Sequence, residues 1–247
     1  MLSALVIGAV TTIFIHGLAF YRESRGYGRE LKRTAFFASI GILALLTFFL
    51  SEHLTSRMVL LTGCVLLHSL RHVFSIWMFP KKDFPEGGTF SKLFRRYTRS
   101  VIFTLLVALP IIVTNAFGGP ALGVFGYFAV ALFLAGFSLE VAADLELARF
   151  RSEPRNAGHL LTSGPFTRSR HPDYFGEIVL WVGLALLALP VETWGILAMF
   201  SPLLLWIFFR LGRIPQVEEE LRAYPEFEAQ YLATRALLPL PRRPLSE

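Results

Sequence analysis

The segment 164–177, with the sequence GPFTRSRHPDYFGE, concentrates residue types that can bind an anion. Arg168, Arg170 and His171 are hydrogen-bond donors that stand just ahead of an apolar run, and Pro172 lies at the boundary. A helix N-terminus exposes free N–H groups and a partial positive charge, so donors at this place favour a site for phosphate or another anion. The alternative is a basic flank of a membrane helix that ends in a capping turn.

Carboxylates follow at helical spacing inside apolar sequence. Glu140 and Asp144 are one turn apart at the end of one apolar run, and Asp173 and Glu177 repeat the pattern at the start of the next. Residues four apart share a helix face, and charges within membrane helices are functional hypotheses by default. We expect these carboxylates to accept hydrogen bonds from the hydroxyls or amide of a ligand. The alternative is pairing with a nearby arginine such as Arg149.

His68 lies within the apolar run 58–78, about 15 Å from its start at the rise of an α-helix. It is either a proton donor or a residue that hydrogen-bonds a neighbouring helix. His68 and His72 are four residues apart, but Arg71 lies between them, so no metal site is predicted. The chain has no GxGxxG, Walker or nucleophile-elbow motif, which excludes nucleotide binding by a Rossmann domain.

The elements that must position these residues are membrane helices. Of 247 residues, 54% are hydrophobic and only 17% are charged, which indicates an all-α integral membrane protein. Runs of membrane-spanning character predict about seven transmembrane helices, at 2–20, 35–50, 58–78, 101–116, 121–142, 174–189 and 194–209. The short connections between them predict a single membrane domain, 1–247.

The basic residues predict an orientation. They gather in every second connection, at 22–33, 81–99 and 149–170, and again from residue 210 onward, whereas the intervening loops hold only Arg57. The positive-inside rule then places the N-terminus outside and the C-terminus in the cytoplasm. Because the rule explains the net charge of +6, no nucleic-acid partner is predicted.

Residues 136–243 resemble the steroid 5α-reductase-like superfamily of membrane enzymes. The resemblance rests on LELARFR at 145–151, on GPFTRSRHPDYFGE, and on the ending IPQVEEE, YPEFEAQY and TRALLPLPRR. The superfamily also holds sterol reductases and isoprenylcysteine carboxyl methyltransferases, and the tail is similar to its bacterial members. The resemblance therefore implies a multi-pass protein of a bacterial inner membrane, with substrate-side helices in 1–120 and a cofactor-binding half in 121–247.

What the resemblance implies for chemistry is an NADPH-dependent reductase of a carbonyl-conjugated C=C bond in a steroid or other lipid. Asp173 stands where these families usually have Asn. Glu52 and His68 are at suggestive positions for the acid that polarises the substrate carbonyl. The expected cofactor contacts, taken together, are Glu140, Asp144, Arg151, Arg168, Arg170, His171, Asp173, Tyr174, Glu177, Arg213 and Tyr231.

Two other functions remain open. An S-adenosylmethionine-dependent methyltransferase of the isoprenylcysteine type would also suit the RHPxYxG motif and the paired Glu218 and Glu219. A transporter or scaffold is the third, although the chain lacks the paired broken helices in two related halves that are typical of transporters. We expect the reductase, because the phosphates of NADPH suit arginines better than lysines and S-adenosylmethionine carries no phosphate.

Overall fold

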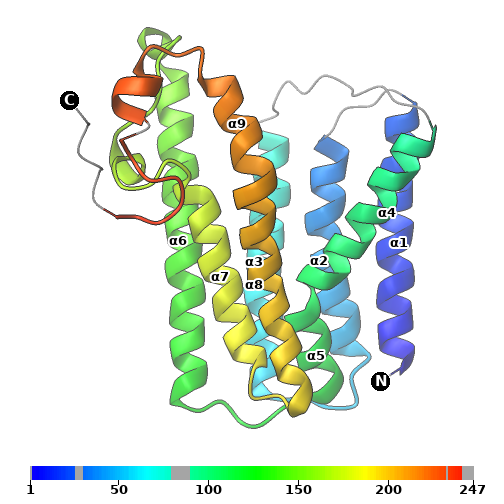
Figure 1. The fold of residues 1–247 in the computed structure, drawn as a ribbon. Coiled ribbons are helices and arrows are strands. Elements are labelled where there is room, and N and C mark those ends of the chain that lie inside the picture. Colours follow the sequence, from blue (N-terminus) through cyan, green and yellow to red (C-terminus); the bar gives the residue numbers. More distant parts are fainter. Residues whose placement is uncertain (1, 26–29, 79–89, 232, 241–247) are drawn as a thin grey trace. The chain divides into compact units, whose positions relative to one another are not determined.

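The computed structural model describes residues 2–25, 30–78, 90–231 and 233–240. Among these residues the regular structure is helical throughout and there is no strand (Figure 1). Five residues of the predicted basic connections, Arg29, Lys81, Lys82, Arg242 and Arg243, lie outside the described ranges. The predicted all-α class is confirmed.

Several helical stretches of the described chain are long and apolar enough to cross a membrane. Four qualify alone, Lys32–Phe49, Ser56–Trp77, Val124–Ser152 and Thr193–Leu221, and a bent helix pair brings the number to five. Large apolar side chains such as Phe14 and Phe74, each 64% exposed, stand on their outer faces or on neighbouring helices, as expected for contact with lipid. The chain is a multi-pass integral membrane protein.

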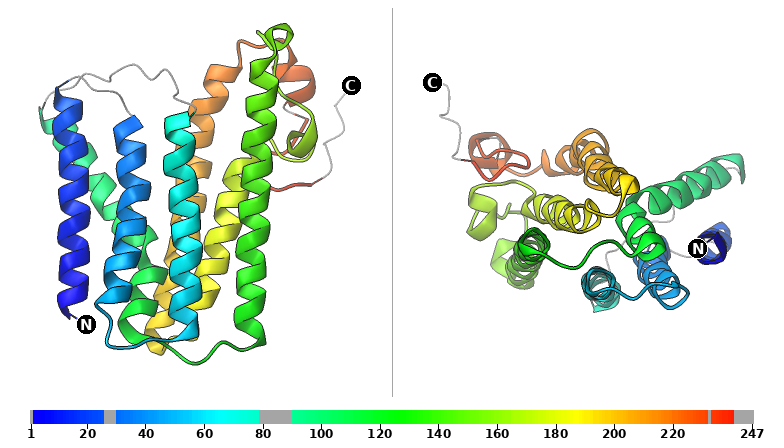
Figure 2. Two further views of the ribbon diagram at one scale, coloured as in Figure 1. Left: turned by 180° about the vertical axis from the view of Figure 1, so that it is seen from behind. Right: turned by 90° about the horizontal axis from the view of Figure 1, so that it is seen from below.

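The chain divides into two compact units, 1–130 with 184–201, and 131–183 with 202–247. We call them the N-terminal unit and the C-terminal unit. The N-terminal unit contains α1 (Leu2–Ser24), α2 (Glu30–Phe49), α3 (Ser56–Met78), α4 (Phe90–Val107), α5 (Leu109–Phe117) and the 3₁₀-helix η3 (Thr193–Met199). In it, α2 packs between α1 and α3, and α1 also contacts α4 (Figures 1 and 2).

The fourth predicted span, 101–116, is two helices rather than one. α4 and α5 meet at a bend of 50° around Ala108. Pro110 lies in the first turn of α5, and a proline has no N–H to continue the hydrogen bonds of the preceding helix. The bend leaves α4 free to take a direction different from that of α5.

A buried arginine holds the N-terminal unit together at the start of α3. Arg57 is 2% exposed, and its guanidinium donates hydrogen bonds to the carbonyl oxygens of Leu187 and Pro120 (3.1 Å for the latter). These acceptors lie at the C-terminal end of α7 and in the connection before α6, where helix carbonyls lack partners of their own. Arg57, the arginine that the sequence places in the basic-poor connections, therefore stabilises the packing of the N-terminal unit.

The C-terminal unit contains most of α6 (Val124–Ser152) and α7 (Pro172–Ala188), joined through the short 3₁₀-helices η1 (Pro154–Asn156) and η2 (Gly164–Thr167). It continues with α8 (Phe200–Ile207), a π-helical turn η4 (Phe208–Arg213), α9 (Ile214–Leu221) and a second π-helical turn η5 (Phe227–Tyr231). π-helical turns inside helices are rare and often mark functional sites.

Candidate functional site

Two glycines bring α6 and α7 into backbone contact. A Cβ atom built on Gly136 would lie 2.5 Å from the backbone nitrogen of Leu180 and 2.6 Å from the carbonyl oxygen of Gly176. A Cβ atom on Gly176 would lie 2.9 Å from the amide nitrogen of Glu140. No Cβ atom fits at such distances, so glycine is required at both positions for this close approach. The contact places Glu140 of α6 beside Glu177 of α7 along one helix interface.

Both glutamates of this interface are buried, Glu140 with 3% and Glu177 with 6% of its surface exposed. Trp181 donates a hydrogen bond from its indole nitrogen to the Glu177 carboxylate, at 2.9 Å. Asp144 follows Glu140 by one turn, and Asp173 precedes Glu177 by one turn. The spacing seen in the sequence therefore does place the acids on the facing sides of two packed helices.

The electrostatics of Asp173, in the first turn of α7, reflect this crowding. Asp173 lies close to His171 and to the carboxylates of Asp144 and Glu140. Acids gathered in this way can accept hydrogen bonds from ligand hydroxyls or attract a positively charged group.

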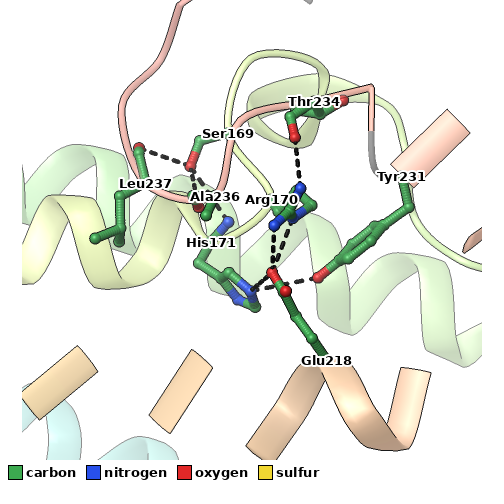
Figure 3. A network of polar contacts seen from close by, with 8 residues as sticks. All are labelled: Ser169, Arg170, His171, Glu218, Tyr231, Thr234, Ala236 and Leu237. Carbon is green, nitrogen blue, oxygen red and sulfur yellow. Dashed lines mark hydrogen bonds and ion pairs between the residues drawn. The ribbon is translucent and has the colours of Figure 1, made fainter. Parts of the chain in front are cut away.

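The loop ahead of α7 is tied to α9 by a network centred on Glu218 (Figure 3). One oxygen of Glu218 accepts a hydrogen bond from Arg170 Nε at 2.8 Å, forms an ion pair with Arg170 Nη2 at 2.8 Å, and lies 3.2 Å from His171 Nε2. The Tyr231 hydroxyl lies 3.4 Å from the same histidine nitrogen. Such charge-assisted hydrogen bonds are short and strong. Arg170 and His171, which the sequence predicts as ligand donors, are thus also held by internal partners.

The segment 234–237 is bound along the same loop (Figure 3). The backbone amides of Arg170 and His171 donate to the carbonyls of Arg235 and Ala236, at 2.8 and 3.1 Å. Ser169 Oγ donates to the carbonyl of Leu237 at 2.8 Å, and Arg170 Nη1 donates to that of Thr234 at 2.8 Å. We call 234–237 the C-terminal strap. It fixes the loop from the side opposite Glu218.

Aromatic rings extend from this network into the unit. The His171 ring stacks on Tyr174 with centroids 5.2 Å apart, and Tyr174 stacks on Phe209 at 4.5 Å with planes only 3° apart. The Arg170 guanidinium lies 5.3 Å from the centroid of the Tyr231 ring. Tyr174 and Tyr231, both predicted cofactor contacts, therefore belong to the same cluster as His171.

A pocket of about 460 Å³ opens beside Glu218, between α9, η4 and the strap. Its charged lining consists of Arg170, Arg210, Glu218, Glu219, Arg222, Glu228 and Arg235. The Nε atom of Arg235 is buried and has no hydrogen-bond partner among the described residues. An unpaired buried donor is costly, and an anionic ligand would satisfy it.

The predicted arginines divide into two groups. Arg170 lines the pocket, whereas Arg151, Arg168 and Arg213 are exposed and are not among its lining residues. The lining arginines that were not predicted as site residues are Arg210, Arg222 and Arg235. A signal for the first was available, because Arg210, Ile214 and Glu218 follow at intervals of four residues and share a helix face.

The two predicted catalytic residues belong to the N-terminal unit. Glu52 is exposed in the connection between α2 and α3, and His68 is fully buried in the middle of α3. The helical rise from Ser56 to His68 is about 18 Å, so the two side chains do not converge on one point. The ring of His68 contacts Phe37, and Phe37 stacks on His72 with centroids 3.8 Å apart. Their catalytic role stays a prediction.

A comparison with protein-family models finds one that covers most of the chain. The model of a family described as a protein of unknown function (DUF1295) matches residues 33–234. The match includes both α6–α7 carboxylate pairs, the loop 168–171 and Glu218. A comparison with curated proteins finds no match.

Proposed function

The chain belongs to the DUF1295 family, whose function is unknown, and from its C-terminal unit we propose that it is an NADPH-dependent reductase acting on a carbonyl-conjugated C=C bond of a lipid. The observation that carries the proposal is the arginine-lined pocket next to Glu218. A phosphorylated dinucleotide needs both cations for its phosphates and acceptors for its hydroxyls, and the unit offers both.

The phosphate groups would be held by Arg210, Arg222 and Arg235. Arg170 is not counted among them because it is already bound by Glu218. The pair between Arg222 and Glu219, at 3.2 Å, is exposed and contributes little, so Arg222 can exchange this partner for a phosphate. Arg235 supplies a buried donor that has no partner among the described residues, and its planar guanidinium suits a phosphate oxygen. This donor set fits a phosphorylated cofactor better than one without phosphate.

The rest of the cofactor would contact the acids. Asp144 and Asp173 can accept hydrogen bonds from ribose hydroxyls. NADPH supplies a hydride when bound. The chain's own contribution is to bind, to orient and to exclude water, with Glu140 and Glu177 buried between α6 and α7.

The same proposal includes the finer membrane topology. Seven spans would follow if α1 and the 17-residue α7 cross the bilayer with the other helices, and the basic connections would then face the cytoplasm of a bacterial inner membrane. The C-terminal unit would meet its cofactor on that side. A steroid or other lipid is the proposed substrate, and Glu52 and His68 stay the candidates for the acid.

A methyltransferase that uses S-adenosylmethionine is the second candidate. The crowded carboxylates around Asp173 favour it, because they would stabilise a sulfonium cation. The arginine pocket would then have no role in cofactor binding. The two candidates therefore differ in whether Arg235 matters for the cofactor.

The test is thermal unfolding of the detergent-purified full chain with NADPH, NADH and S-adenosylmethionine. A ligand that binds only the folded state stabilises it, by about 2.7 kcal/mol at a hundred times its Kd. We expect NADPH to raise the Tm most, NADH to raise it less, and S-adenosylmethionine to leave it unchanged.

Arg235→Gln should abolish most of the NADPH shift. Arg149→Gln, which removes an exposed arginine of α6 outside the pocket, is the matched control and should keep it. A shift with S-adenosylmethionine alone, or an NADPH shift that both variants retain, would contradict the proposal.

A further inference from the structure

The outer face of α4, in the N-terminal unit, combines a basic end with an apolar stripe. Arg95 and Arg99 are exposed, Ile102 is 52% exposed and Leu106 is 41% exposed. The steps between these residues are four, three and four, so all of them lie on one side of the helix. No role in cofactor binding has been given to any of them.

The opposite side of α4 is fixed to the rest of the unit. Thr104 and Ser100 hydrogen-bond the ring of His16 on α1, at 3.0 and 3.2 Å, and the Tyr97 hydroxyl donates to the carbonyl of Ile13 at 3.2 Å. The orientation of the helix is therefore set by α1. The Arg95–Leu106 stripe faces outward as a consequence of this packing.

The two arginines are not neutralised by the acid nearby. Glu23 of α1 pairs with Lys32 and, at 3.6 Å, with Arg96. Neither Arg95 nor Arg99 pairs with an acidic side chain among the residues that the structure describes. Two guanidinium groups one helical turn apart form a site for a phosphate, which arginine can bind with two parallel hydrogen bonds.

The dimensions match one leaflet of a bilayer. From Arg99 to Val107 at its C-terminal end, α4 rises about 12 Å, and one leaflet contributes about 15 Å of hydrocarbon. The arginines then lie at the level of the headgroups while Ile102 and Leu106 lie at the level of the acyl chains. A soluble anion would use only the first half of this stripe.

We propose that the Arg95–Leu106 face of α4 binds an anionic phospholipid, with the lipid phosphate between Arg95 and Arg99 and an acyl chain along Ile102 and Leu106. The site is separate from the proposed reductase and does not depend on it. It would anchor the bent α4–α5 pair to the leaflet in which the basic end of α4 lies.

Native mass spectrometry of the detergent-purified full chain tests the site. The probes are dioleoylphosphatidylglycerol, dioleoylphosphatidylcholine with the same acyl chains, and glycerol 3-phosphate, which has no chains. We expect one retained phosphatidylglycerol, bound about 30-fold more tightly than phosphatidylcholine, because each of the two arginines strengthens the binding of an anionic lipid about fivefold. Glycerol 3-phosphate should not be retained.

The variant Arg95→Gln/Arg99→Gln should lose that preference, while Arg149→Gln/Arg155→Gln, which removes two exposed arginines of the C-terminal unit, should keep it. Ile102→Ser should weaken both lipids. Equal retention of the two lipids by the unmodified chain would overturn the proposal. So would an equal loss in both arginine variants, or retention of glycerol 3-phosphate, which would assign the arginines to a soluble anion. Unchanged Tm values of the lipid-free variants would show that each is folded.

Discussion

Replacing Glu218 by Gln should loosen the C-terminal strap, because Glu218 is the acceptor on which the network depends. It accepts a hydrogen bond from Arg170 Nε and forms an ion pair with Arg170 Nη2, and the exposed fractions of the Glu218 and Arg170 side chains are only 18% and 13%. Glutamine keeps the shape and one neutral acceptor but removes the negative charge. Arg170 would then be a mostly buried cation without a counter-ion.

The magnitude lies between two limits. Breaking a fully buried ion pair costs about 3–5 kcal/mol, and an exposed pair contributes about 0–1 kcal/mol. For a pair that is mostly but not fully buried, and with a glutamine that can still accept, we expect about 2 kcal/mol. That corresponds to an opening equilibrium about 30-fold more favourable.

Hydrogen–deuterium exchange measures this opening directly. The amides of Arg170 and His171 donate to the strap carbonyls of Arg235 and Ala236, so their exchange reports its release. Glu218→Gln should speed both amides by about 30-fold. Glu219→Gln is the control one position away. Glu219 is 72% exposed and its partner among the described residues is Arg222 on the surface, so the change should be under about fivefold. Equal exchange in the two variants would refute the reasoning.

Three further predictions concern packing and pH. Gly136→Ala should lower the free energy of unfolding by several kcal/mol, about the scale of severe core defects, because its Cβ would meet the α7 backbone. Gly63→Ala in α3, which has open space around it, is the control and should be neutral or stabilising in thermal unfolding. Arg57→Ala should lower the Tm strongly, and Arg57→Lys should not restore it, since one ammonium cannot reach the carbonyls that the guanidinium bridges. Hydrogen bonding from His159 lowers the pKa of Glu226, so the stabilisation by this carboxylate is complete above its unfolded pKa of about 4.3 and is lost as the pH falls through the lower folded value. The protection factor of the Leu160 amide, which donates to Glu226 at 3.4 Å, should fall over that acidic range.

Local patterns predicted the elements that carry the site. Apolar runs gave the positions of α6 and α7, and the four-residue spacing of Glu140 and Asp144 correctly indicated one shared helix face. The segment 164–177 does form a loop that leads into a helix at Pro172. These features depend on neighbours within one or two helical turns, which the sequence displays directly.

Contacts between distant segments could not be predicted in the same way. Arg170 and Glu218 are 48 positions apart, and the strap meets Ser169 across 68 positions. Such pairing depends on the return of the chain through α8 and α9, and no pattern of neighbouring residues specifies which side chains then meet. The arginines before α7 therefore suggested a ligand site by themselves. In the structure Arg170 pairs with Glu218, and the other pocket arginines come from η4, from the residue after α9 and from the strap.

The central claim, that the C-terminal unit binds a phosphorylated dinucleotide, is tested most directly by displacement of bound NADPH. The nicotinamide fluorescence of NADPH would be titrated against the detergent-purified full chain, and the complex would then be challenged with adenosine 2′,5′-bisphosphate or with S-adenosylmethionine. We predict saturable binding that the bisphosphate displaces and S-adenosylmethionine does not, with Arg235→Gln weakening NADPH about tenfold or more, the scale of one charge-assisted hydrogen bond. An absence of NADPH binding, or displacement by S-adenosylmethionine alone, would contradict the account.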